Sequence, residues 1–336
     1  MKAAVWKSVN KIEIEEIGIP EIANGEVLIK VVYAGICGSD ITILNGKHIN
    51  AKPPVVLGHE FSGIVEESKS SYFKKGDRVG VEPLVSCGFC KPCSEGNNHV
   101  CANLKLLGIN ENGAFAQYTK AHEAKTFKIP DKMSLAEAAM LEPFSVAMHG
   151  MDVSKMRIGS HILVVGAGPI GAMTALLAGY FGAGKVMISE LTDFRVNYAK
   201  KLGFSAFNPT KEGDLLAHVL KNTDGNGADI AFECGGTPES VKACLDCIGI
   251  KGRVVQIGIP KQLVETDYRR MIYKEQEIMG IRIYQKGTFG RAIRFLSDRN
   301  IALKDFVSHF FSLEDIAKAI ECADDKNRSM KVLIKF

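Results

Sequence analysis

Four cysteines that lie close together constrain the fold of this chain more than any other feature. They follow the pattern C-x2-C-x2-C-x7-C within fifteen residues, at Cys87, Cys90, Cys93 and Cys101. Glycine and proline residues between them keep the backbone irregular, so that it can wrap around a small ion. Four thiolates suit a closed tetrahedral Zn²⁺ site with a structural role. The alternatives are separate core cysteines or two disulfides, and the dense spacing favours the metal.

The bulk composition narrows the class of protein. A chain of 336 residues with 46% hydrophobic content predicts about two domains. The 42 basic and 38 acidic residues give a net charge of +4, without a Lys/Arg block, so we expect no nucleic-acid partner. An odd count of nine cysteines and a charged N-terminus indicate a cytoplasmic protein with reduced thiols. The uncharged run 162–184 is broken by glycines and a proline, so we expect a strand, a turn and a helix instead of a membrane span.

The pattern of hydrophobic residues changes along the chain. The first third alternates short β patterns with turns, and a capping box at Ser134 and Glu137 then begins a helix. From about residue 155 strands alternate with helices, which predicts a doubly wound parallel sheet. A helix and a closing strand at 331–334 follow. The strands expected in the first third are 12–17, 27–33, 55–57, 61–65, 78–81 and 113–118, and those expected later are 161–165, 185–190, 229–233, 253–257 and 277–284.

A glycine motif follows the first strand of this second region. Residues 166–171 read G-x-G-x-x-G, formed by Gly166, Gly168, Pro169, Ile170 and Gly171. After a strand and before a helix, this motif lets a dinucleotide pyrophosphate approach the backbone at the helix N-terminus. The alternative is a glycine turn without a ligand.

An acidic residue at the end of the next strand supports the cofactor interpretation. Glu190 stands where a carboxylate binds the ribose hydroxyls, and its charge would repel a 2′-phosphate, so we expect NAD instead of NADP. Arg195 either flanks the adenine or is a solvated surface residue.

A second possible metal site is dispersed over the first half of the chain. Cys37 and His59 lie in glycine-flanked turns. Glu142 lies in a helix otherwise built from alanine, methionine and leucine, where a carboxylate is costly unless it has a partner such as a metal. A thiolate, an imidazole and a carboxylate, with water as the fourth ligand, would form an open catalytic Zn²⁺ site.

Taken together, these motifs make the chain resemble the zinc-dependent medium-chain dehydrogenases/reductases, the superfamily of alcohol, polyol and threonine dehydrogenases, over essentially its whole length. The resemblance implies a mostly-β, GroES-like catalytic domain formed by residues 1–145 and 287–336, with a Rossmann domain, 146–286, inserted between them. The motifs that carry it are GICGSD at 35–40, GHE at 58–60 with Gly63, the four cysteines, GDRV at 76–79, Glu142-Pro143 and the glycine motif.

The resemblance also implies roles for individual residues. Cys37 and His59 would bind the catalytic zinc, with Glu60 as a carboxylate that can exchange onto it, and Ser39 would take the proton of the substrate. Glu142 stands where the Cys₂His enzymes have their second cysteine, and it would bind zinc directly or through a water. Many relatives carry a proton-passing histidine where this chain has Thr42, so His48, a water chain or a shorter relay would serve instead.

The function expected from these residues is NAD-linked, zinc-dependent oxidation of a secondary alcohol. The substrate would be a polyol, a sugar or sugar phosphate, or a hydroxy amino acid, and each chain would carry two zinc ions in a homodimer or homotetramer. The alternatives are a zinc-free quinone or enoyl reductase of the same fold and a non-catalytic NAD-sensing protein. The presence of both metal sets argues against these alternatives.

Overall fold

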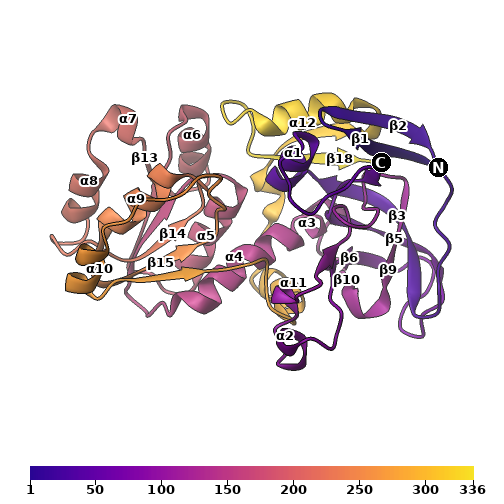
Figure 1. The fold of residues 1–336 in the computed structure, drawn as a ribbon, viewed down its shortest axis with the longest axis horizontal. Coiled ribbons are helices and arrows are strands. Elements are labelled where there is room, and N and C mark those ends of the chain that lie inside the picture. Colours follow the sequence, from indigo (N-terminus) through magenta and orange to yellow (C-terminus); the bar gives the residue numbers. More distant parts are fainter. The chain divides into compact units, whose positions relative to one another are not determined.

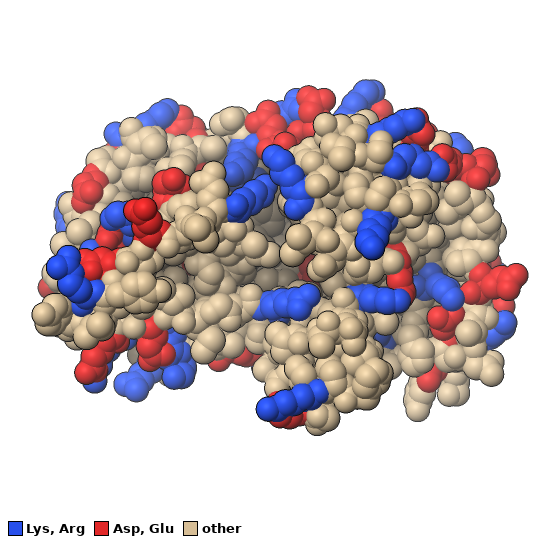
Figure 2. All heavy atoms as spheres, in the orientation of Figure 1, with Lys and Arg blue, Asp and Glu red and all other residues tan.

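The computed structural model describes all of residues 1–336, which form two compact units. The first unit comprises Met1–Pro143, Gln285–Asp325 and Ser329–Phe336, and the second comprises Phe144–Tyr284 and Lys326–Arg328. Both chain termini lie in the first unit (Figure 1). None of the helices is long and apolar enough to cross a membrane. On the face shown in Figure 2, acidic and basic side chains are interspersed over much of the surface.

The first unit is mostly β-structure. One sheet has the order β2-β1-β4, a larger one the order β10-β6-β5-β3-β18-β17 with β9 also paired to β3, and β7 pairs with β8. The strands are β1 Lys2–Ser8, β2 Lys11–Glu16, β3 Glu26–Gly35, β4 Val55–Val56, β5 Glu60–Ser68, β6 Arg78–Val81, β7 Leu84–Val85, β8 Lys105–Leu106, β9 Tyr118–His122, β10 Thr126–Lys128, β17 Val307–Ser312 and β18 Lys331–Lys335.

Strand β3 is central to this unit because it pairs with three other strands. Its apolar residues Val27, Ile29 and Val31 are buried in the core, as the alternating pattern of the sequence predicts. It runs antiparallel to both β5 and β18, and its last residue, Gly35, is the register partner of Glu60 on one side and Leu333 on the other. The end of β3 therefore brings the start of β5 and the C-terminal strand β18 to one place.

The helices of the first unit are short. They are α1 Gly38–Leu44, α2 Lys91–Ser94, α3 Leu135–Ala138, α11 Thr288–Arg299 and α12 Ile316–Asp324, and the boundary between the units falls within α4 Leu141–Ser154. The capping box is present at α3: Ser134 Oγ accepts from the amide of Glu137 at 3.2 Å, and the Glu137 carboxylate accepts from the amide of Ser134 at 3.0 Å. The single helix expected there is divided into α3 and α4.

The strand expected at 113–118 is wrong. The strand β9 begins only at Tyr118, and the amides of 113–115 donate to carbonyls of the turn between β4 and β5. A Cβ added to Gly113 would lie 2.2 Å from the carbonyl oxygen of Gly58. The two backbone segments therefore lie so close together that no side chain fits between them at this position. The β pattern of the sequence here reflects burial against another loop.

The second unit is a six-stranded parallel sheet with the order β13-β12-β11-β14-β15-β16, which confirms the predicted doubly wound arrangement. The helices α5 and α9 pack against β11 and its neighbours (Figure 1). The strands are β11 His161–Val165, β12 Lys185–Ser189, β13 Ser205–Phe207, β14 Ala228–Glu233, β15 Ile248–Gln256 and β16 Glu277–Gly280, and the helices are α5 Pro169–Tyr180, α6 Asp193–Lys201, α7 Pro209–Glu212, α8 Leu215–Lys221, α9 Pro238–Cys247 and α10 Tyr268–Lys274.

The last strand of this sheet is shorter than the expected range 277–284. It ends at Gly280, and Ile283 has a φ of +51°, a left-handed conformation that a strand cannot contain. Strand propensity is high over this range, but the turn decides the end of the strand.

Candidate metal centres and cofactor site

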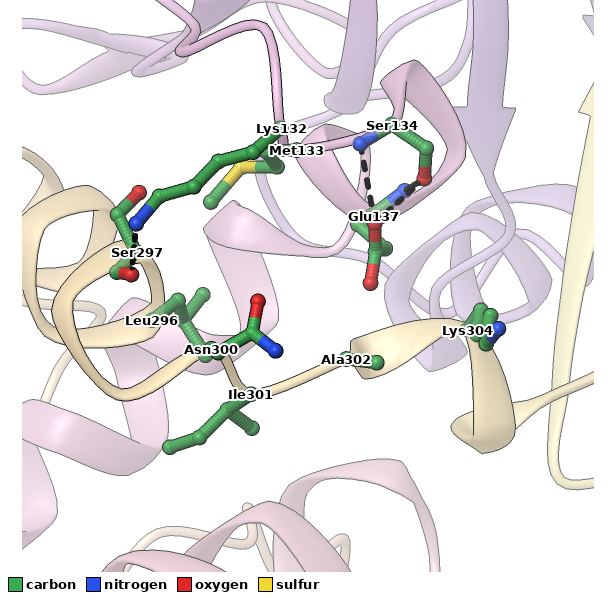
Figure 3. A pocket seen from close by; sticks show the side chains of 10 residues that line it. All are labelled: Lys132, Met133, Ser134, Glu137, Leu296, Ser297, Asn300, Ile301, Ala302 and Lys304. Atoms are coloured by element: carbon green, nitrogen blue, oxygen red, sulfur yellow. Dashed lines mark hydrogen bonds between the residues drawn. The ribbon is translucent and has the colours of Figure 1, made fainter.

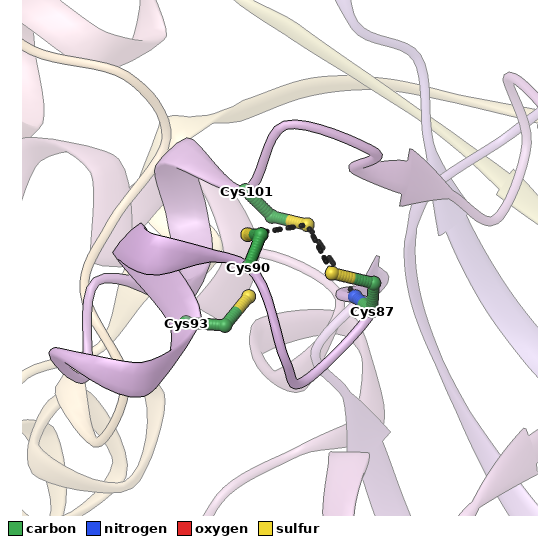
Figure 4. Close-up of side chains that lie close together, drawn as sticks. All are labelled: Cys87, Cys90, Cys93 and Cys101. Carbon is green, nitrogen blue, oxygen red and sulfur yellow. Dashed lines mark hydrogen bonds between the residues drawn. The ribbon is translucent and has the colours of Figure 1, made fainter.

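The four predicted cysteines converge in the cysteine lobe, residues 87–101 (Figure 4). Their sulfur atoms all lie within 4.8 Å of one another, with 3.5 Å between Cys101 and Cys87 and 3.8 Å between Cys90 and Cys101. The strands β7 and β8 form the base of the lobe, and α2 positions Cys93. Four sulfur atoms at this spacing fit a tetrahedral zinc ion.

The electrostatics of the cysteine lobe also favour a cation. Hydrogen bonds from the amides of Ala102 and Cys93 lower the pKa of Cys90 to about 6. Burial, together with the neighbouring thiols, raises the pKa of Cys93 to about 12. The lobe thus favours thiolates at Cys87 and Cys90 and resists one at Cys93, and a divalent cation would offset the repulsion among the four thiolates. The donor set therefore fits structural Zn²⁺.

A second group of metal-ligand atoms lies in the first unit at the end of β3. The donor atoms of Cys37, His59 and Glu60 all lie within 4.8 Å of one another. Cys37 is the N-cap of α1, His59 immediately precedes β5, and Glu60 is its first residue. A thiolate, an imidazole and a carboxylate at this separation fit an open Zn²⁺ site with a position left for a further ligand.

Asp40 orients this group, a role that was not predicted from the sequence. It is fully buried and accepts a hydrogen bond from the amide of Cys37 at 2.8 Å. Its Oδ1 lies 3.6 Å from Nδ1 of His59, which leaves Nε2 for a metal. Burial lowers the pKa of His59, but the charges of Asp40 and Cys37 and their hydrogen bonds outweigh it and raise that pKa well above its usual value. The pocket thus favours a positive charge at His59.

A buried ion pair lies directly beside this group. Lys331, the first residue of β18, contacts the carboxylate of Glu60 and also donates to the carbonyl of Ile36 at 2.9 Å. Both side chains are almost completely inaccessible to solvent. They cross over Gly35, where an added Cβ would lie 2.3 Å from Glu60 Oε2 and 3.0 Å from Lys331 Cε. Glycine is therefore required at this position.

Glu142 lies in the first turn of α4 and is also buried. Burial, with the charges of Glu60 and Asp40, raises its pKa to about 7 against the opposing charges of His59 and Lys331. Glu142 is thus electrostatically coupled to the metal group, but it does not belong to the three residues whose donor atoms lie within 4.8 Å of one another. In this arrangement Glu60, rather than Glu142, supplies the nearest carboxylate.

The groups considered for proton transfer differ in their hydrogen bonds. Ser39 Oγ lies 3.3 Å from Nε2 of His59, beside the metal group. The hydroxyl of Thr42 donates to the carbonyl of Gly38 at 2.9 Å, within α1. His48 Nδ1 accepts from two backbone amides, and burial, with the charge of His59, lowers the pKa of His48. Protonation of His48 would break those two bonds, so the geometry favours a water chain or a shorter relay.

The glycine turn, residues 166–171, connects β11 to α5 in the second unit. Gly166 has a φ of +102°, and a Cβ added to Gly171 would lie 1.8 Å from the carbonyl oxygen of Gly166. Gly168 is the N-cap of α5, and Pro169 and Ile170 begin the helix. These constraints produce a tight turn at a helix N-terminus, which suits a pyrophosphate.

The structure brings Glu190 and Arg195 to this turn. Glu190 follows β12, and its Oε2 accepts from the amide of Ala167 at 2.9 Å, while its Oε1 accepts from the amide of Leu191 at 2.7 Å. The guanidinium of Arg195 lies close to Gly168, since an added Cβ there would be 3.3 Å from Nη1. Both side chains therefore lie beside the glycine turn.

Two surface pockets of the first unit contain none of the predicted site residues. One, of about 290 Å³, lies between α3 and the end of α11 (Figure 3). There Lys132 donates to the carbonyl of Ser297, and Glu137 is engaged in the capping box. The other, of about 620 Å³, is bordered by β7 and β9. Neither pocket therefore contributes to the candidate sites.

Comparison with known proteins identifies the family. Residues 23–131 match the model of the alcohol dehydrogenase GroES-like domain, and residues 169–298 match that of the zinc-binding dehydrogenases. The chain belongs to the zinc-type medium-chain dehydrogenase/reductase family. It is 37% identical to sorbitol dehydrogenase from Bacillus subtilis (strain 168), with 99% of this chain and 97% of that protein covered.

Two further proteins of this family are similar over their full lengths. L-threonine 3-dehydrogenase from Escherichia coli (strain K12) is 34% identical, with 98% of this chain and 99% of that protein covered. The crystal structure of a zinc-binding dehydrogenase from Sinorhizobium meliloti 1021 bound to NADP has a TM-score of 0.94 and 31% identity, covering 100% of this chain and 99% of that one. The predictions of a dehydrogenase, and of a GroES-like domain with a Rossmann domain, are confirmed.

Family membership leaves the roles of individual residues as predictions. The structure brings together Cys37, His59 and Glu60, and separately the four cysteines of the lobe. Sequence reasoning missed Asp40 and Lys331. Asp40 lies three residues after a predicted ligand, which is a usable signal, but Lys331 opens an apolar strand and carries no local sign of its partner.

We expect Glu142→Gln to leave the metal-free enzyme at least as stable as the parent above about pH 7. The pKa of Glu142 is raised from 4.5 to about 7 in the folded state. The folded parent therefore binds this proton more tightly than the unfolded chain does. Its free energy of unfolding falls as the pH rises through that range, whereas glutamine has no proton to lose. With zinc present, the variant should bind zinc more weakly and lose about 100-fold in turnover. Melting temperature at two pH values, zinc content and turnover check this.

A matched control is Glu82→Gln. Glu82 is equally buried but contacts Lys125, away from the metal groups. Breaking this pair should lower the melting temperature by several degrees with zinc content unchanged. If Glu142→Gln behaves like this control, with full zinc occupancy and a large loss of stability, then Glu142 pairs with Lys331 and is not a ligand.

Proposed function

We propose that this enzyme oxidises a secondary alcohol of a polyol, a sugar or sugar phosphate, or a hydroxy amino acid, with NAD as hydride acceptor. The observation that carries the proposal is the close grouping of Cys37, His59 and Glu60 with Ser39 beside His59. The named relatives, a sorbitol and a threonine dehydrogenase, act on secondary alcohols in a polyol and a hydroxy amino acid, which supports this substrate class.

The first unit would activate the alcohol. Cys37 and His59, with Glu60 or Glu142, would hold a zinc ion, which supplies Lewis acidity that lowers the pKa of an alcohol. The charge of Asp40, whose Oδ1 lies 3.6 Å from Nδ1 of His59, would favour a ring orientation that leaves Nε2 for the ion. Ser39 accepts the hydroxyl proton of the substrate and passes it to water. His59, Glu60 and Asp40 are buried, whereas Cys37 and Ser39 are partly exposed, which leaves the proton a path to solvent.

The second unit would hold the hydride acceptor. The amides of the glycine turn would bind the pyrophosphate, Glu190 would contact the adenosine ribose, and Arg195 would flank the adenine. Bound NAD⁺ would supply the hydride acceptor, and Ser39 would receive the hydroxyl proton, so that one alcohol and NAD⁺ would yield one ketone, NADH and a proton. We expect this reaction to take place in the cytoplasm.

A substrate panel with two variants tests this function. Polyols, sugar phosphates and threonine are supplied with NAD, and NADH absorbance is followed. We expect two zinc ions per chain in the parent, and in His59→Ala only the zinc of the cysteine lobe and no turnover, because an open site has too few ligands to lose one. The surface variant His122→Ala should keep both zinc ions and full activity.

The outcome distinguishes the alternatives. One zinc per chain in the parent without turnover would indicate an NAD-binding protein. Turnover of quinones or enoyl substrates without zinc would indicate the reductase. Normal turnover by a zinc-depleted His59→Ala protein would refute the assignment of the catalytic site.

Glu190 should set the cofactor preference. We expect Glu190→Ala combined with Leu191→Arg to raise the ratio of kcat/KM with NADP to that with NAD by about tenfold or more, because a carboxylate repels the 2′-phosphate and an arginine binds it. Glu190→Gln is the control that removes the charge and keeps an acceptor for the Ala167 amide. The structural relative bound to NADP makes this test necessary. A parent that already prefers NADP would contradict this assignment.

We also infer that the enzyme is a homodimer or a homotetramer. The edge strand β16 is exposed along its length, and it presents Ile278 and Met279, while α10 exposes Ile272 and Tyr273. An exposed apolar edge offers unpaired backbone groups to the same strand of a second copy. Ile278→Lys should shift the sedimentation coefficient toward a smaller species, whereas Ile250→Lys, at a more exposed position at the start of β15, should not. A monomeric parent would refute this inference.

A further inference from the structure

Glu233 is a buried charge that the proposed function does not use. It is the last residue of β14 and is fully buried. Its Oε1 accepts from the amides of Gly235 and Gly236, both at 2.8 Å, and from the hydroxyl of Ser240, and its Oε2 accepts from Nε2 of Gln256. No lysine or arginine forms an ion pair with it. A carboxylate held only by neutral donors keeps a negative charge inside the unit.

The donors belong to the segments that follow two neighbouring strands. Gly235 and Gly236 lie between β14 and α9, and Ser240 is in the first turn of α9, so the partial positive charge at the N-terminus of α9 is directed at the carboxylate. On the other side, the amides of Ile257 and Gly258 donate to the backbone carbonyl of Glu233 at 3.0 and 2.9 Å. Glu233 therefore fixes the loops after β14 and β15 relative to each other.

The position of Glu233 in the sheet points to the cofactor. Its register partner is Val165, the residue before the glycine turn, and the backbone of Cys234 lies 3.0 Å from where a Cβ of Gly166 would be. The strand order reverses between β11 and β14, and ligands of open parallel sheets bind at the carboxyl ends of the strands at this point. Glu190 lies beyond β12, on the side of the adenosine. Glu233 lies on the opposite side of the turn, where the other half of a dinucleotide extends.

We infer that Glu233 is a positioning residue for the nicotinamide half of the cofactor and that its charge favours the oxidised ring. This inference rests on the proposed use of NAD. The nicotinamide of NAD⁺ carries a positive charge that is lost when hydride is accepted. A fixed negative charge in a buried environment interacts more favourably with the charged ring than with the neutral one. Glu233 thus increases the affinity for NAD⁺ relative to NADH and assists release of the reduced product.

The test measures the two dissociation constants separately, by NADH fluorescence and by competition with NAD⁺, in the zinc-loaded enzyme. Glu233→Gln should raise the Kd for NAD⁺ about tenfold and that for NADH by less than about twofold. Ser240→Ala is the matched control, because it removes one donor from the same loop and leaves the charge, and it should change both constants by the same factor. An equal change of both constants in Glu233→Gln would reduce Glu233 to a structural role and overturn the inference.

A further variant keeps the test decisive if Glu233→Gln does not fold. Gln256→Ala removes a neutral donor from the carboxylate. The Kd for NADH divided by the Kd for NAD⁺ should then stay the same or rise. A fall in this ratio, which means relatively tighter binding of NADH, would overturn the inference. A parent enzyme that binds neither NAD⁺ nor NADH would instead refute the proposed function itself, so the two failures are distinguishable.

Discussion

The first unit depends on the buried ion pair between Glu60 and Lys331. Burial of two charges is costly, and the cost is offset only where geometry and further hydrogen bonds are good. Here Lys331 satisfies both Glu60 and the carbonyl of Ile36, and the pair lies across Gly35, where no side chain could be accommodated. The pair joins β18 to the start of β5 through the end of β3. It therefore fixes the segments that carry Cys37 and His59.

The same pair leaves the metal group with an excess of negative charge. Asp40, Glu60 and Glu142 are all buried around His59, and Lys331 is the single buried lysine or arginine among them. Against the effect of burial, the charges of Asp40 and Cys37 raise the pKa of His59, whereas burial and the charges of Glu60 and Asp40 raise that of Glu142, so both side chains retain a proton to a higher pH than usual. A divalent cation would replace these protons, which couples metal binding to proton release. The cysteine lobe shares this property at one position, since burial also raises the pKa of its Cys93 thiol.

The second unit uses buried carboxylates differently. Glu190 follows β12 and Glu233 ends β14, the two strands that flank β11. Each carboxylate accepts hydrogen bonds from backbone amides of a neighbouring turn. Each carboxylate thereby rigidifies a turn at the carboxyl edge of the sheet. Glycines at 166, 171 and 258 let these turns approach one another, since an added Cβ would meet a neighbouring backbone atom at each of them. Charge and lack of side chains together shape the cofactor site.

The sequence by itself determined the features that depend on short-range spacing. The cysteine lobe, the glycine turn and the capping box at Ser134 each lie within a few consecutive residues, so spacing alone predicts them. The alternation of strands and helices likewise predicts the parallel sheet. Residues 113–118 do not form the predicted strand, because their apolar pattern reflects packing against Gly58. The strand predicted at 277–284 ends early, because Ile283 adopts a backbone angle that residue type does not reveal.

Only the tertiary structure decided which distant groups meet. Lys331 reaches Glu60 over 271 residues because β18 and β5 both pair with β3, and the register of those pairs is not written in any local pattern. For the same reason the structure groups Glu60 more closely than Glu142 with the metal ligands, and it places Glu233 beside the glycine turn. Residue types and spacings identify the kinds of site, whereas the register between strands selects the partners of each buried charge.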